Sequence, residues 1–157
     1  MKIRLCVFML LVGMASFQAL AIDDHKFGPE AAPFCPKLPE GSGFEWEWVF
    51  RIDWGHCIGR VAETHGEAFD FGIARLYGVM PPGMLEPETS FVKSGSVGGT
   101  PVRWYRASRH RGPESLEYRT FTLLNEEKMA YLSVTVYAAS ESQMDERLNL
   151  MEQLAYR

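Results

Sequence analysis

Four histidines are the residues of this chain whose chemistry most readily suggests catalysis or metal binding. They are His25, His56, His65 and His110. His56 and His65 lie nine positions apart, with Cys57 beside the first of them. Zinc sites usually draw on closer pairs such as H-x-x-x-H or C-x-x-C. We therefore expect ordinary polar roles for these histidines, with no metal ion and no other cofactor.

A hydrolytic site would need a base, a carboxylate that orients it and a nucleophile. His65 and Asp70 could supply the first two, and Ser94 or Ser96 the third. The G-x-S-x-G pattern of a nucleophile elbow is missing from the sequence. We assign no catalytic residue, and an envelope hydrolase that uses His65 or His56 with a nearby carboxylate is the alternative interpretation.

Two segments carry side chains that would suit a protein partner. A proline-rich loop brings apolar residues, and a strand end followed by a loop brings cationic ones. Arginine suits recognition of carboxylates and phosphates, and apolar loop residues suit a dry contact. The candidate partner-binding residues are Met80, Met84, Leu85, Arg106, Arg109, His110 and Arg111.

The N-terminus has the three parts of a secretory signal peptide. Lys2 and Arg4 give the positive region, residues 5–17 the apolar region, and Ala19-Leu20-Ala21 the cleavage pattern. The apolar run is shorter than the ~20 residues of a membrane-spanning helix. We predict cleavage between Ala21 and Ile22, a periplasmic or secreted location, and no stable membrane insertion afterwards.

Cleavage would change both the cysteine count and the charge. Cys6 would leave with residues 1–21, so the mature chain would keep Cys35 and Cys57, which we expect to form a disulfide in an oxidising compartment. The loss of two basic residues and no acidic one would take the net charge from −4 to −6. Such a charge argues against nucleic acid as a partner.

Hydrophobic patterning predicts the strands and one helix. Residues 44–53 alternate, with aromatic and aliphatic side chains on one face, which is typical of a half-buried strand. Residues 56–67 are ambiguous between helix and loop, and residues 69–77 suggest a second strand. Two hairpins follow, with strands at 91–97 and 100–107 and then at 116–124 and 129–138.

A helix should follow the last strand. Ser140 and Gln143 fit a capping box, and apolar residues recur at helical spacing on one face. These elements predict an α+β domain over residues 44–157. It would contain a twisted antiparallel sheet of about five or six strands, packed by the C-terminal amphipathic helix. Residues 22–43, which carry four prolines, should form an extended arm.

The order of elements over residues 88–157 resembles that of PsbP-like small α/β domains. The resemblance rests on element order alone, so it transfers no site residues. It implies an accessory protein more than an enzyme, because members of that fold are often non-catalytic.

Together these features favour an exported, non-catalytic protein that binds another protein of the cell envelope. An inhibitor or an immunity protein that neutralises a secreted toxin would fit this description. Self-association as a homodimer stays open. A further alternative is a small-ligand-binding accessory protein in which Trp46 and Trp48 line a pocket between the sheet and the helix.

Overall fold

The computed structural model describes residues 35–51, 54–75, 90–107, 115–125 and 130–155. The elements along the chain are β1 (Phe44–Arg51), β2 (Trp54–Val61), β3 (Glu67–Arg75), β4 (Phe91–Val97), β5 (Thr100–Arg106), β6 (Leu116–Asn125), β7 (Ala130–Ala138) and α1 (Glu141–Glu152). Among the described residues, no helix has both the length and the apolar character needed to cross a bilayer.

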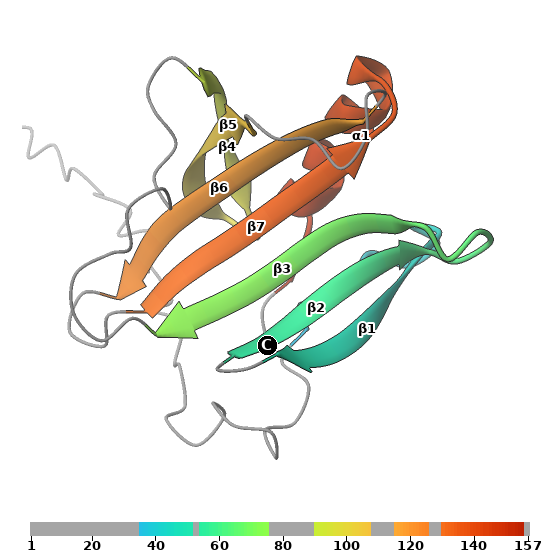
Figure 1. The fold of residues 1–157 in the computed structure, drawn as a ribbon, viewed down its shortest axis with the longest axis horizontal. Coiled ribbons are helices and arrows are strands. Elements are labelled where there is room, and N and C mark those ends of the chain that lie inside the picture. The colour runs from blue at the N-terminus through green and yellow to red at the C-terminus, as the bar shows by residue number, and fades with distance from the viewer. Residues whose placement is uncertain (1–34, 52–53, 76–89, 108–114, 126–129, 156–157) are drawn as a thin grey trace, which may run out of the picture.

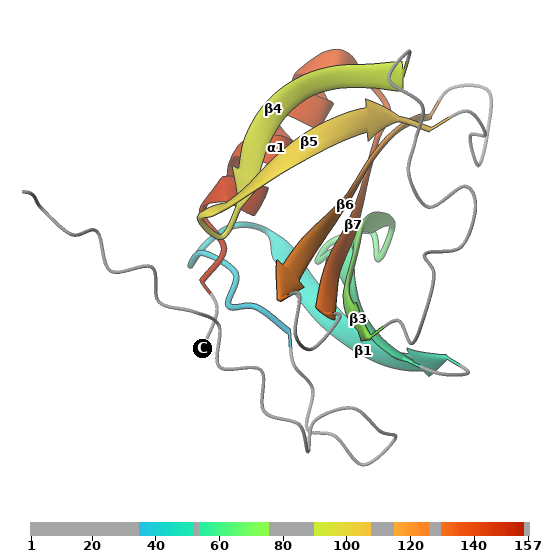
Figure 2. The ribbon, with the colours of Figure 1, turned by 90° about the vertical axis from the view of Figure 1, so that its left-hand side faces the viewer.

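All seven strands belong to one antiparallel sheet, in the order β1-β2-β3-β7-β6-β5-β4. Each half of the sheet is a meander of strands that follow one another in the sequence. The two meanders join where β3 pairs with β7. Figures 1 and 2 show a strongly twisted sheet that bends around one side, where α1 lies against it.

The predicted α+β class with five or six strands is wrong, because the described residues are mostly β, with seven strands in one sheet and one helix of 12 residues. The main error concerns the segment left ambiguous at residues 56–67, whose first part belongs to β2 (Trp54–Val61). Its glycines make room for aromatic rings of the neighbouring strands. A Cβ on Gly55 would lie 1.9 Å from Cη2 of Trp48, and one on Gly59 would lie 2.4 Å from Cδ2 of Phe69. Glycine disfavours a strand by itself, but here the packed rings compensate for its missing side chain.

The strands predicted at residues 44–53, 91–97, 100–107, 116–124 and 129–138 are confirmed within two residues. The helix expected after the last strand is also confirmed, and it ends at Glu152. Gly98 and Gly99 both have positive φ, of 53° and 82°, as expected for the two-residue turn of the β4–β5 hairpin. The Ser140 side chain accepts a hydrogen bond from the Gln143 backbone, and the Gln143 side chain accepts one from the Ala139 backbone. Together these two bonds cap the N-terminus of α1.

The core lies between the bent face of the sheet and α1. Strand β7 is central and its inward side chains have almost no exposed surface, while Met144, Leu148 and Met151 face it from the helix. Arg147 is also buried there. Its Nη1 donates to the carbonyl of Tyr137, and burial lowers its pKa. This guanidinium therefore adds a hydrogen bond between α1 and the end of β7.

The described part of the predicted arm, from Cys35 onward, is fixed to this body. The expected disulfide between Cys35 and Cys57 is confirmed and ties the arm to the inner face of β2, with the two Cα atoms 5.5 Å apart. The Trp46 indole donates to the carbonyl of Pro36 over 2.6 Å. Lys37 exchanges two backbone hydrogen bonds with Ala155. The arm is therefore bonded both to β2 and to the segment that follows α1.

Candidate functional site

Strand β1 forms one edge of the sheet, and its backbone shows which residues face outward. Among the described residues, β1 pairs only with β2. The carbonyl of Gly43 accepts from the Ala62 amide, 3.0 Å away. Because bonding direction alternates along an antiparallel strand, Glu45 and Glu47 point their backbone groups toward β2. The backbone groups of Phe44, Trp46 and Trp48 therefore point away from the sheet, toward its open edge.

The opposite edge, β4, differs in ways that protect sheet edges. Its pairing with β5 is broken by an irregularity between Phe91 and Lys93. Lys93 Nζ bonds Asp145 of α1 at 2.7 Å, and the Gly98 amide donates to Met151 of the same helix. Bulges and lysines hinder the addition of a further strand. By contrast, β1 pairs with β2 over eight residues without any register shift.

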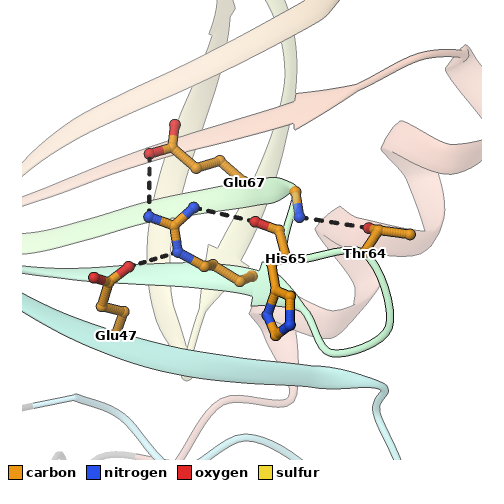
Figure 3. A network of polar contacts seen from close by, with 6 residues as sticks. Glu47, Thr64, His65 and Glu67 are labelled. Atoms are coloured by element: carbon orange, nitrogen blue, oxygen red, sulfur yellow. Dashed lines mark hydrogen bonds and ion pairs between the residues drawn. The ribbon is translucent and has the colours of Figure 1, made fainter.

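Arg60, on β2, contacts residues of β1, of β3 and of the turn between β2 and β3. Figure 3 shows three of these partners, Glu47, His65 and Glu67. Arg60 Nε donates to Glu47 at 2.5 Å and its Nη1 to the His65 carbonyl at 3.1 Å. Its Nη2 lies 4.0 Å from Oε1 of Glu67. His65 has a positive φ of 55°, which is uncommon for a residue other than glycine. Arg60 thus fixes both a carboxylate of β1 and the turn between β2 and β3.

A shallow depression of about 440 Å³ opens at this point, lined by Glu45, Trp46, Glu47, Arg60 and His65. Glu45 lies directly opposite Arg60 in the strand register, although Arg60 bonds Glu47 instead. Glu45 is exposed and forms no ion pair with the described residues. The depression therefore contains one carboxylate without an ion pair to any described residue, beside a strand edge that no described strand pairs with.

The structure pairs Asp70 with His56 and not with His65. Nδ1 of His56 and Oδ1 of Asp70 are 2.6 Å apart, and both side chains are largely buried. This is the arrangement of a base and its orienting carboxylate. The predicted nucleophiles, Ser94 and Ser96, lie on β4, and three strands separate them from β3. The triad considered from the sequence is therefore not assembled.

Of the seven candidate partner-binding residues, only Arg106 lies in the part of the chain that the structure describes. The other six lie outside the described residues: Met80, Met84, Leu85, Arg109, His110 and Arg111. Arg106 donates to Glu141 at 2.5 Å, and its guanidinium lies 5.8 Å from the Tyr118 ring centroid. The Tyr118 hydroxyl donates to the same carboxylate at 2.9 Å. These contacts connect β5 and β6 to the first turn of α1.

The Trp46 ring packs within the aromatic cluster of the sheet. Its centroid lies 6.2 Å from those of Phe69 and Phe71. Trp48 lies over Gly55, and both tryptophans are half-buried against the core. The described residues contain no group of three or more histidines, cysteines or acids that could hold a metal ion.

The sequence did not predict the contacts of Arg60 with Glu47 and Glu67, because these three residues come from β2, β1 and β3. The alternation of residues 44–53 does place Glu45 and Glu47 on one face, which was the available signal. It could not show that this strand lies at an edge. Comparison of the chain with family models, curated proteins and solved structures gave no match, and nothing in them bears on the resemblance to PsbP-like domains.

Proposed function

We propose that this chain is an exported, non-catalytic protein that binds another protein of the cell envelope by accepting a strand at the edge of β1. The β1 edge is regular and unpaired among the described residues, and this observation carries the proposal. An added strand gains affinity from main-chain hydrogen bonds, and specificity comes from alternate side chains. Inhibitors and immunity proteins that neutralise a secreted toxin are binding proteins of the kind we have in mind.

Export is supported by the N-terminal pattern and by the disulfide. A Cys35–Cys57 bond is consistent with an oxidising compartment. We propose that the signal peptide is cleaved between Ala21 and Ile22 and that the mature protein is periplasmic or secreted. N-terminal sequencing of the protein recovered from the envelope fraction tests this. Recovery of the uncleaved chain from the cytoplasm would contradict it.

The strand-addition mechanism can be tested by capture from envelope extracts with two matched variants. In Trp48→Ala the backbone amide that points to the open edge remains, whereas in Trp48→Pro it is lost. Both variants lack the indole, so the difference between them isolates the amide. We expect the wild type and Trp48→Ala to retain a partner that Trp48→Pro loses.

Equal retention by both variants would contradict strand addition, and so would failure of the wild type to retain any protein. Circular dichroism checks that each variant is folded. If Trp48→Pro does not fold, hydrogen exchange on the wild-type complex replaces it. The amides of Trp46 and Trp48 should then become protected when the captured partner is added.

The His56–Asp70 pair supports a second candidate function, an envelope hydrolase. Its ring and carboxylate have the geometry of a general base held by an orienting group. The expected observation is turnover of cell-wall or lipid substrates by the purified protein, abolished in His56→Ala. Turnover that survives this substitution would remove the pair from consideration.

A further inference from the structure

We infer that the strand accepted by β1 carries basic side chains at alternate positions, with apolar side chains between them. This inference rests on the proposed function, since it names the chemistry of the partner at the same edge. It follows from the charges around the depression, from the register that an added strand would take, and from the poorer fit of a second copy.

The charges beside the edge favour a cation. Among the described residues that line the depression, two carboxylates, Glu45 and Glu47, accompany one arginine, Arg60, which leaves an excess of negative charge. Arg60 is already bonded to Glu47 and to the His65 carbonyl. An anionic ligand would have to compete for it. A lysine or arginine side chain would instead meet Glu45, which has no ion-pair partner among the described residues.

The register strengthens this preference. In an antiparallel addition, the outward backbone groups of Trp46 and Trp48 would form the hydrogen bonds. The residues opposite Glu45 and Glu47 would then be non-hydrogen-bonded pairs, in which facing side chains come closest. Two basic residues spaced two apart would meet both carboxylates. The residues between them would lie on the face of Trp46 and Trp48, where apolar side chains fit.

A second copy of this chain meets these requirements less well. Two copies could pair their β1 strands antiparallel about a two-fold axis. With this axis at Trp46, Glu45 would lie opposite Glu47 of the second copy, and like charges that face each other are destabilising. With the axis at Trp48, Arg51 of the second copy would lie opposite Glu45, but Val49 of the second copy would lie opposite Glu47. No such register supplies a basic residue to both acids.

Blocked eight-residue peptides provide the probe. One alternates lysine and valine, a second has glutamate in place of lysine, and a third has the lysine–valine composition in two blocks. Each is titrated into the oxidised protein up to millimolar concentration, with amide chemical shifts and hydrogen exchange as readouts. We expect only the alternating lysine peptide to bind and to protect the Trp46 and Trp48 amides, with weaker binding at high salt.

The protein variants test the contribution of Glu45. We expect Glu45→Lys to weaken binding of the lysine peptide about tenfold, since a cross-strand attraction becomes a repulsion. Glu45→Gln should have an intermediate effect. Glu146→Gln, at an exposed position of α1, makes the same charge change as Glu45→Gln but away from the edge, and should bind like the wild type.

The outcomes separate the partner chemistry from the proposed function. If the glutamate peptide binds as tightly and protects the same amides, strand addition stands and the basic partner is wrong. If the lysine peptide binds without protecting Trp46 and Trp48, or fails to bind at millimolar concentration, the inference is also wrong. Sedimentation of the protein alone should show a monomer, and a dimer lost in Trp48→Pro but kept in Trp48→Ala would assign the edge to a second copy.

Discussion

Gly59 and Phe69 face each other across β2 and β3, and the phenyl ring takes the space that a larger residue would need. A Cβ on Gly59 would lie 2.4 Å from Cδ2 of Phe69, a side chain with no exposed surface. The glycine is thus a packing requirement of the sheet and not a flexible point in it.

We therefore expect Gly59→Ala to lower the free energy of unfolding by about 1–3 kcal/mol, the usual cost of overpacking a core. Urea denaturation measures this loss. Gly72→Ala is the control, because its Cβ would be 3.6 Å from the nearest atom, the Gly55 carbonyl oxygen, which is ordinary contact. An equal loss in both variants would show that glycine flexibility, and not the Phe69 ring, sets the effect.

Removal of the disulfide should destabilise the protein more than most single substitutions. The bond connects positions 22 residues apart and ties the arm to β2. We expect reduction to lower the free energy of unfolding by about 2–4 kcal/mol. The double variant Cys35→Ala/Cys57→Ala should lose a similar amount and should no longer respond to reductant. A wild type that is equally stable with and without reductant would contradict the prediction.

Tyr118 should make stability fall in alkaline solution. Burial raises its pKa above the ordinary value of 10.0, and the hydrogen bond to Glu141 adds to the shift. A group with a raised pKa in the folded state contributes its stabilisation fully below its unfolded pKa and loses it as pH rises through the folded value. Stability should therefore decline above about pH 10, and Tyr118→Phe should decline less. Urea denaturation between pH 8 and pH 11 measures this; parallel curves for the two proteins would exclude Tyr118.

Hydrogen exchange should reveal the open edge in the free protein. The amides of Glu45 and Glu47 bond β2, whereas those of Trp46 and Trp48 point outward. We expect the outward amides to exchange much faster than their neighbours, in an alternating pattern along β1. Uniform slow exchange along the whole strand would mean that something already covers this edge.

The sequence predicted individual strands better than it predicted their assembly. Alternation of apolar residues identified β1, and Gly98-Gly99 identified the β4–β5 hairpin, because both signals are local. Strand β2 was missed because Gly55 and Gly59 weaken any local preference. Its strand conformation depends on rings contributed by Trp48 and Phe69, which lie outside it in the sequence.

The candidate site was harder to predict than the strands, because it depends on the order of the strands in the sheet. Cys35 and Cys57 could be paired by elimination, since they are the two cysteines left after the predicted cleavage. Nothing in the spacing of Glu47, Arg60 and Glu67 indicates that they meet, or that β1 ends the sheet. His56 rather than His65 bonds Asp70 because antiparallel pairing of β2 and β3 sets His56 within two residues of it on the adjacent strand.

The junction of β3 with β7 has a consequence for how the chain folds. Every other strand pair joins neighbours in the sequence, whereas residues 76–129 lie between these two strands. Loop-closure entropy makes such a distant pairing slow to form, while each meander can assemble from local contacts. The first meander, with its disulfide, is synthesised before β7, so one side of β3 would be unpaired until β7 is made. Correct folding therefore depends on protecting this side of β3 until the last strand and the helix are added.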